Sequence, residues 1–124
     1  MALKLISVVN SNTPEKEYVR IQATADTNIQ GYAVVDRTFD EDGILSNEFR
    51  HIYVFHKLDI KKGDWIRLFS CAGKYNSNVN TGKTHTHNIY WGSKTCIWND
   101  NGLDTASLVK VQLVNSVSVP KPKS

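Results

Sequence analysis

The sequence predicts an all-β domain of about seven to nine strands, for two reasons. Short runs rich in β-branched and aromatic residues alternate with clusters of turn-forming residues, and the clusters recur roughly every 8–12 residues. No segment repeats its apolar residues with the 3.6-residue period of an amphipathic helix. This spacing favours an antiparallel β-sandwich or a small barrel, with an oligonucleotide-binding barrel and a jelly roll left open as alternatives.

The individual strands follow from alternation of apolar and polar side chains. In residues 17–24, Val19, Ile21 and Ala23 share one face and the intervening residues are polar, which predicts a strand with one buried face. The other expected strands are less regular and cover residues 3–9, 30–38, 50–56, 65–71, 85–91, 95–98 and 105–114. Near the end of the last one, Lys110 shares a phase with Leu108, so we expect a bulge or a solvent-exposed end there.

Between these strands the composition indicates turns and loops. Residues 10–16, 26–28, 40–43 and 99–102 are rich in Asn, Asp, Gly, Ser or Pro and are predicted to turn the chain. Residues 73–83 form the longest polar stretch, and its Asn and Ser side chains compete with a β-ladder for backbone hydrogen bonds. We therefore expect an exposed loop over residues 73–83.

Length, charge and the N-terminal sequence limit the expected number of domains, the kind of partner and the location of the protein. The 124 residues are expected to form one domain over residues 1–116, followed by a flexible basic tail over residues 117–124 that contains Lys121 and Lys123. The net charge is only +3, and the sequence lacks the dense basic stripe of a dedicated DNA-binding domain. The N-terminal sequence has no signal-peptide pattern and no run approaches the length of a membrane span, so we expect a cytoplasmic protein without membrane contact.

Aromatic and sulfur side chains complete the expected core. Trp65, Trp98, Tyr53 and Phe55 are predicted to pack inside the domain, where aromatic rings remove large apolar areas from water. Trp91 precedes two small residues, and its pattern leaves both core packing and an exposed surface open. The two cysteines, Cys71 and Cys96, are predicted to be reduced, half-buried thiols.

Several of these segments, in their order and spacing, resemble lamin tail domains. The matching features are an acidic-aromatic-Val-x-Ile strand, a Gly-aromatic strand ending in Asp, an aromatic-x-Phe pair, and a Trp-Asn segment before a final strand. They fall at Glu17–Ile21, Gly31–Asp36, Tyr53–Phe55 with Leu58 and Gly63, and Ile97–Leu108. Two positions differ: Leu103 separates Gly102 from Asp104, which predicts a reshaped turn, and His56 replaces a frequent proline.

The resemblance implies an immunoglobulin-like β-sandwich that acts as an interaction module. Members of this family bind different proteins, and some bind nucleic acid. It therefore implies a non-catalytic domain, without a cofactor, whose partner is another protein or a second copy of the chain. Fold alone does not determine function, which depends on the residues of a particular site.

The predicted binding residues are Lys74, Tyr75, Lys83 and Trp91. The segment from Lys74 to His85 combines positive charge, an aromatic ring and many amides, which is the chemistry of a surface that contacts phosphates and stacks a base. Tyrosine is also frequent at protein interfaces, so the same segment suits a protein partner. Nucleic-acid binding through this loop is the main alternative to protein binding; a carbohydrate platform built on Tyr90 and Trp91 is a weaker one.

A metal site is the remaining candidate. His85 and His87 are two residues apart, so on a strand their imidazoles face the same side and could hold one ion. Zinc sites use about four ligands, and the nearest other candidates (His51, His56, Asp59 and Cys71) are distant in sequence. Two histidines alone do not make a site, and the sequence contains no phosphate-binding loop or nucleophile elbow. The prediction is therefore a protein without enzymatic activity.

Overall fold

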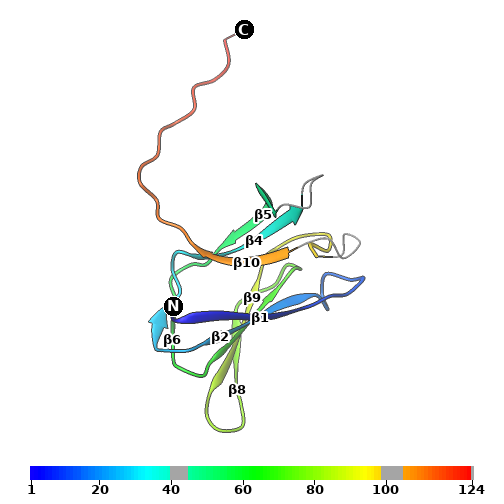
Figure 1. The fold of residues 1–124 in the computed structure, drawn as a ribbon, viewed down its shortest axis with the longest axis vertical. Coiled ribbons are helices and arrows are strands. Elements are labelled where there is room, and N and C mark those ends of the chain that lie inside the picture. The colour runs from blue at the N-terminus through cyan, green and yellow to red at the C-terminus, as the bar shows by residue number, and fades with distance from the viewer. Residues whose placement is uncertain (40–44, 99–104, 124) are drawn as a thin grey trace.

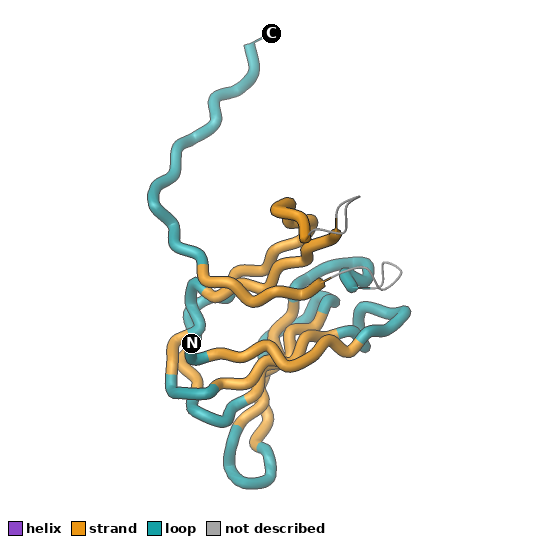
Figure 2. The backbone as a smooth tube through the Cα atoms, in the orientation of Figure 1, coloured by secondary structure: helices purple, strands orange, loops and turns teal. Residues whose placement is uncertain are grey.

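The computed structural model describes residues 1–39, 45–98 and 105–123, with only the backbone described for residues 38, 39 and 45–50. All regular structure in these residues is β (Figure 2). Because they contain no helix, none of them forms a helix that could cross a membrane. The strands are β1 (Leu3–Val9), β2 (Tyr18–Ala23), β3 (Thr27–Asn28), β4 (Tyr32–Phe39), β5 (Leu45–Val54), β6 (Asp59–Ile60), β7 (Trp65–Phe69), β8 (Asn76–Val79), β9 (His85–Tyr90) and β10 (Thr105–Lys110).

Two larger sheets form separate layers, which Figure 1 shows nearly edge-on. One sheet has the strand order β1-β2-β7-β9-β8 and the other has the order β10-β4-β5, while β3 and β6 form a small two-stranded sheet. Most neighbours are antiparallel, but β7 and β9 run parallel, so the first sheet is mixed and not purely antiparallel as the sequence predicted. The C-terminal segment after β10 leaves the body and extends away from it (Figure 1).

The hydrophobic core lies between the two larger sheets. Alternation in β2 buries Val19 and Ile21, and alternation in β7 buries Ile66 and Leu68, which confirms the predicted buried face of residues 17–24. From the other sheet and its flanks the core receives Tyr32, Val34, Phe55, Ile97 and Trp98, with Tyr53 packed against it. The predicted core positions of Phe55, Trp98 and Tyr53 are therefore confirmed.

Residues 95–98 do not form the predicted strand. Their backbone is held by Glu17, whose side chain is completely buried. Its Oε1 accepts hydrogen bonds from the N–H groups of Ile97 (2.7 Å) and Trp98 (3.3 Å) and from the hydroxyl of Ser70 (2.6 Å). Because a carboxylate takes the place of a neighbouring strand, the segment packs its apolar side chains into the core without joining a sheet.

The segment predicted as a loop over residues 73–83 instead contains β8. Its four residues are all exposed and pair only with β9, so β8 is an edge strand. Polar side chains on an edge strand stay in water and need not compete for the ladder, which is why Asn and Ser are tolerated there. Together with the two-residue strands β3 and β6, β8 brings the number of strands in the described residues to ten, against the seven to nine expected.

The last strand is shorter than predicted. β10 ends at Lys110 instead of residue 114, and residues 111–123 are exposed, which agrees with the solvent-exposed end expected there. The predicted turns at 40–43 and 99–102, and the reshaped turn that includes Asp104, lie outside the described residues.

Gly73 supports the pairing of β8 through a close approach to an aromatic ring. A Cβ at this position would lie 2.5 Å from Cδ1 of Tyr90, and that ring is stacked on Phe69 with centroids 5.3 Å apart. We expect Gly73→Ala to lower the free energy of unfolding by about 1–3 kcal/mol, because the ring must leave its place. Urea denaturation measures this loss. The same substitution in a Tyr90→Ala background should cost little, and an equal cost there would show that the ring is not the cause.

Candidate functional site

The predicted binding residues of the β8–β9 hairpin do not gather in one place. Lys74 and Tyr75 precede β8, whereas Lys83 lies in the turn that follows it, with a positive φ of 72°. Four strand residues between them span about 13 Å, so the three side chains lie at opposite ends of the hairpin. The loop surface expected from Lys74 to His85 is therefore divided into two ends with different surroundings.

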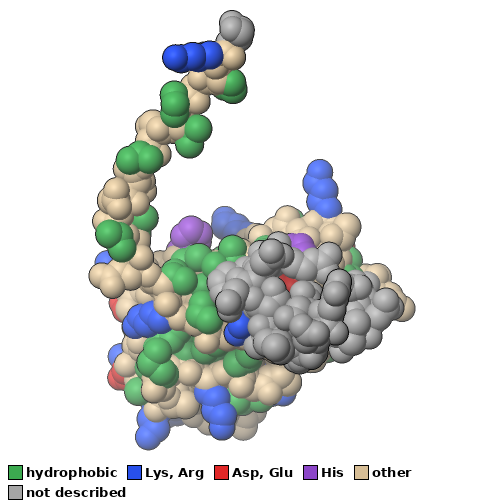
Figure 3. Space-filling model, turned by 45° about the horizontal axis from the view of Figure 1, so that its top comes forward, with side chains coloured by type: hydrophobic (Ala, Val, Ile, Leu, Met, Phe, Trp, Pro, Cys, Tyr) green, Lys and Arg blue, Asp and Glu red, His purple; other side chains and the backbone are tan. Residues whose placement is uncertain are grey.

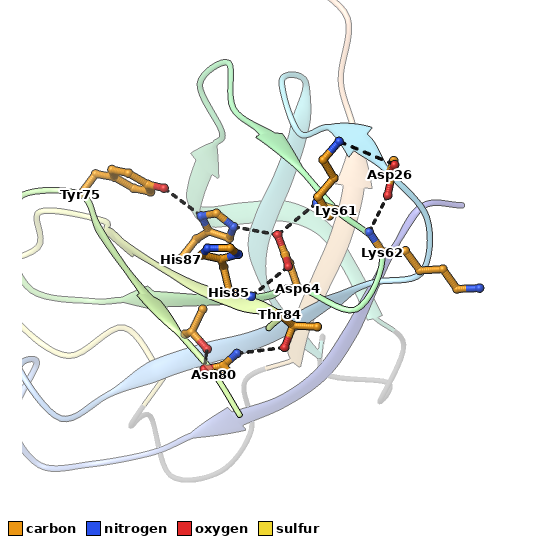
Figure 4. A network of polar contacts seen from close by, with 10 residues as sticks. Asp26, Lys61, Lys62, Asp64, Tyr75, Asn80, Thr84, His85 and His87 are labelled. Carbon is orange, nitrogen blue, oxygen red and sulfur yellow. Dashed lines mark hydrogen bonds and ion pairs between the residues drawn. The ribbon is translucent and has the colours of Figure 1, made fainter. Parts of the chain in front are cut away.

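Tyr75 belongs to a chain of hydrogen bonds that leads into the domain (Figure 4). Its hydroxyl lies 2.8 Å from Nδ1 of His87, and Nε2 of His87 lies 3.0 Å from Oδ2 of Asp64. A carboxylate only accepts, so Nε2–H of the imidazole donates to Asp64; with a neutral ring, the tyrosine hydroxyl then donates to Nδ1. His87 and Asp64 are buried, and the Tyr75 ring is stacked on the imidazole with half of its surface exposed.

Asp64 is the centre of this network. Its Oδ1 accepts the backbone N–H of His85 at 3.0 Å, and its Oδ2 also accepts the backbone N–H of Lys61 at 3.1 Å. Burial by itself raises the pKa of this carboxyl, but the hydrogen bonds from His85, His87 and Lys61 outweigh it and hold the pKa below its ordinary value. Asp64 thus joins the turn before β7 to β9 as an ionised carboxylate.

His85 and His87 do lie near one another, with ring centroids 6.2 Å apart. However, both ring nitrogens of His87 already have hydrogen-bond partners, so binding a metal there would require these bonds to break. Across the described part of the chain, no group of three or more His, Cys, Asp or Glu side chains is arranged to hold an ion. The geometry gives His87 a role in positioning Tyr75.

Trp91 is half-buried inside an aromatic cluster. Its ring centroid lies 5.7 Å from that of Tyr53 and 6.0 Å from that of Trp98, with an edge-on contact to His51 at 6.5 Å. His51 in turn binds the buried Asp36 through Nδ1 at 2.9 Å. The tryptophan therefore closes one end of the core, and only part of its surface faces solvent.

Trp65 differs from its prediction, because it lies on the outer face of the five-stranded sheet and not in the core. The apolar residues Ile66 and Leu68 occupy the inner face of β7, so Trp65, Arg67 and Phe69 alternate outward. With Tyr18 and Arg20 of β2 they form a row of aromatic and guanidinium groups. We call this set (Tyr18, Arg20, Trp65, Arg67) the arginine–aromatic face.

The arginine–aromatic face forms the floor of a groove of about 500 Å³. Its wall comes from β9 and from the turn before it, where Asn80, Thr81, Thr84 and Thr86 line the groove. Sequence reasoning missed this site because it concentrated on loops. The available signal was the same alternation that predicted β2, since it already placed Tyr18 and Arg20 opposite the buried residues.

A second surface of interest is the outer face of the three-stranded sheet. In the register of β4 with its neighbours, Ala33 lies opposite Val54 and Val109, and Val35 lies opposite Ile52. Ala33 and Val35 in the central strand are fully buried, whereas Ile52 and Val54 of β5 keep 46% and 41% of their surface exposed. The face is therefore apolar, and it is open to solvent along β5. We call it the apolar face.

The C-terminal segment continues from the apolar face. β10 carries Val109 on that face, and beyond β10 the exposed apolar residues are Val111, Leu113, Val114, Val117 and Val119. Figure 3 shows hydrophobic side chains along the part of this segment that extends away from the body. The chain passes Gly31 at the root of this segment: Gly31 has a φ of +88°, and a Cβ there would lie 3.1 Å from the Val111 carbonyl oxygen. A side chain at Gly31 would therefore be strained by the backbone conformation and crowded by this carbonyl oxygen.

Both cysteines are free thiols, as predicted. Cys71 is buried and Cys96 is half-buried. Burial, together with the negative charges of Glu15 and Glu17, raises the pKa of Cys96, and burial with the charge of Glu15 raises that of Cys71. Both sulfurs are therefore protonated at neutral pH and are poor nucleophiles.

Comparison with known proteins identifies no family for the chain. No family model matches it, and no curated protein matches it either.

Proposed function

We propose that this chain is a non-catalytic binding module that works through protein–protein contacts, and that its partner is a second copy of itself. The observation that carries the proposal is the pattern of the C-terminal segment. From 109 to 119, odd positions are apolar except for Asn115, and even positions are polar except for Val114. This is the pattern of a strand with one buried face, yet Leu113, Val117 and Val119 are 80%, 82% and 90% exposed.

The apolar side of this segment matches the apolar face of the sheet. Val109 belongs to both, since it sits on the apolar face and begins the odd-numbered series. Nine extended residues from 111 to 119 reach about 30 Å, enough to cross a three-stranded sheet. A second copy therefore offers what the segment lacks: an exposed apolar surface that the same chain carries.

The surroundings of the segment favour exchange between copies over folding back. The chain leaves β10 in an extended direction, and residues 111–119 contain no glycine that would ease a tight reversal. Between the root of the segment and the end of β5 lies a groove of about 720 Å³, lined by Val54, Phe55 and Leu113 among others. In a twofold arrangement each copy gives a segment and receives one, so the contact is closed and self-complementary.

We also propose a more specific fold for the chain. An immunoglobulin-like β-sandwich, similar to a lamin tail domain, is supported by two sheets that enclose one core and by the burial of Trp98 in the segment that carries the resemblance.

The hydrogen-bonded polar side chains inside the domain also favour binding over catalysis. Asp64 and His87 bond to each other; Asp64 also accepts two backbone N–H groups, and His87 bonds to the Tyr75 hydroxyl, so the pair serves to position Tyr75.

The test is the oligomeric state of matched charge variants. We expect the wild-type chain to dimerise with rising concentration in sedimentation velocity runs. The double variant Val117→Asp/Val119→Asp should weaken dimerisation by about 100-fold or more, because it places charges in an apolar contact. The control Ser116→Asp/Ser118→Asp adds the same charge on the opposite side of the segment and should dimerise nearly as well as wild type. A wild-type chain that stays monomeric, or equal loss in both variants, would overturn the proposal.

A further inference from the structure

The arginine–aromatic face contains an unusual pair of like charges. In the antiparallel register of β2 and β7, Arg20 lies directly opposite Arg67, and both side chains point outward. Directly opposed residues have Cβ atoms about 5 Å apart, and like charges in such positions destabilise a sheet. Among the described residues, no acidic side chain forms an ion pair with either arginine. An anion placed between the two guanidinium groups would offset this repulsion.

Aromatic rings hold the two arginines in place. Cζ of Arg20 lies 4.6 Å from the centroid of the Trp65 ring, and Cζ of Arg67 lies 5.8 Å from that of Tyr18. All four residues are half-buried. A guanidinium that stacks on a ring keeps its N–H edge available, and that edge matches the oxygens of a phosphate or carboxylate in bidentate geometry. The arginines are thus restrained before any ligand arrives.

The wall of the groove carries hydroxyl and amide groups in a fixed arrangement. Thr86 donates its hydroxyl to Oδ1 of Asn80 at 2.9 Å, and Asn80 donates through Nδ2 to the hydroxyl oxygen of Thr84 at 3.3 Å. The turn is closed by two backbone bonds, Asn80 N–H to the Thr84 carbonyl (2.7 Å) and Lys83 N–H to the Asn80 carbonyl (3.1 Å). Such a wall suits a ligand with several hydroxyl groups, and the same turn carries the exposed Lys83.

We propose that this groove binds the phosphate ester of a sugar. Arg20 and Arg67 share the phosphate on the floor, and the side chains of Thr81 and Thr84 face the sugar hydroxyls on the wall. The volume of about 500 Å³ lies within the range of small-molecule sites and holds one such unit. The ligand chemistry has two sources, a free sugar phosphate or one unit of a single-stranded nucleic acid. The site is separate from the C-terminal segment, and it does not depend on self-association.

The experiment is a titration of the full chain with each probe. Binding is monitored by tryptophan fluorescence, which should respond through Trp65 in the groove, and by calorimetry. The probes are ribose, ribose 5-phosphate and a single-stranded oligonucleotide of about 12 nucleotides, a length within known site sizes. Ribose 5-phosphate that binds as well as the oligonucleotide identifies a free sugar phosphate. Oligonucleotide binding that is much tighter and falls steeply with salt identifies the nucleic acid. Ribose that binds as well as ribose 5-phosphate, or the absence of binding by all three probes, would overturn the proposal.

Matched variants locate the binding. Arg20→Gln/Arg67→Gln should weaken phosphate binding by at least about tenfold, since it removes two charge-assisted contacts. Lys62→Gln/Lys94→Gln removes the same charge at exposed positions outside the groove and should bind within about twofold of wild type. Arg20→Lys/Arg67→Lys keeps the charge but loses the planar edge, and it should show an intermediate loss. Equal binding by wild type and the double glutamine variant, with unchanged thermal unfolding, would contradict the assignment.

Discussion

Glu17→Ala should lower the free energy of unfolding by about 3–5 kcal/mol, which is the largest single-residue effect expected in this chain. The substitution leaves the N–H groups of Ile97 and Trp98, and the hydroxyl of Ser70, without their buried acceptor. These donors cannot regain water while the core stays closed, so each adds a desolvation cost. Urea denaturation at neutral pH measures the loss.

Two further variants test whether the loss of stability comes from the hydrogen bonds of Glu17 or from a general change in charge. Glu17→Gln keeps one carbonyl acceptor and should recover part of the lost stability. Glu15→Ala removes a carboxylate two residues away that is exposed, and its effect should stay within about 0.5 kcal/mol. Near-ultraviolet circular dichroism should show a changed Trp98 environment in Glu17→Ala alone. If the free energy of unfolding of Glu17→Ala lies within about 1 kcal/mol of the wild-type value in the same two-state fit, the carboxylate does not hold residues 95–98.

Asp64→Asn should cost about 2–3 kcal/mol at neutral pH, and this difference from wild type should shrink in acid. The pKa of Asp64 lies below its ordinary value of 3.8, so the folded state binds this proton less readily than the unfolded chain. The stabilisation is therefore complete above the unfolded pKa and is lost as the pH falls through the lower folded pKa. Wild type should lose stability there, whereas Asp64→Asn has no carboxyl left to protonate.

The control for Asp64 is its exposed neighbour in the same region. Asp26 accepts the backbone N–H of Lys62 at 2.8 Å and lies 3.9 Å from Nζ of Lys61, both near the surface (Figure 4). Asp26→Asn should change stability by no more than about 1 kcal/mol at any pH, because water already solvates these groups. Denaturant unfolding from pH 7 down to about 3 compares the three proteins across the range in which carboxyl groups protonate. A difference between wild type and Asp64→Asn that stays constant over this range would show that ionisation of Asp64 does not stabilise the fold.

Local alternation was enough to predict the all-β class and most of the strands. β2 is the clearest case, since its period of two alone separates Val19 and Ile21 from Tyr18 and Arg20. Trp65 was misplaced because its large apolar ring was assigned to the core by residue type, although its phase in β7 was outward. Phase was the better guide, since neighbouring residues of a strand must point to opposite faces.

Local sequence patterns could not predict the contacts between segments that are distant in the chain. A buried acidic side chain is rare, so nothing in the sequence marked Glu17 as the anchor of residues 95–98, about eighty positions away. Composition also assigned residues 73–83 to a loop, because it could not show that β9 would offer an open edge to β8. The Asp64–His87–Tyr75 chain likewise needs β7, β8 and β9 to meet before its members are neighbours.

The sequence by itself determined the class of structure, the inner face of β2 and the exposed end of the last strand. These features depend on the order of side chains along a single segment, and the period of a strand is a local property. Only the tertiary structure decided that Arg20 faces Arg67, that β7 runs parallel to β9, and that the β5 edge of the apolar face stays exposed. Strand pairing brings together residues that are far apart in the chain, and its register is set by the packing of the whole core and not by any one segment.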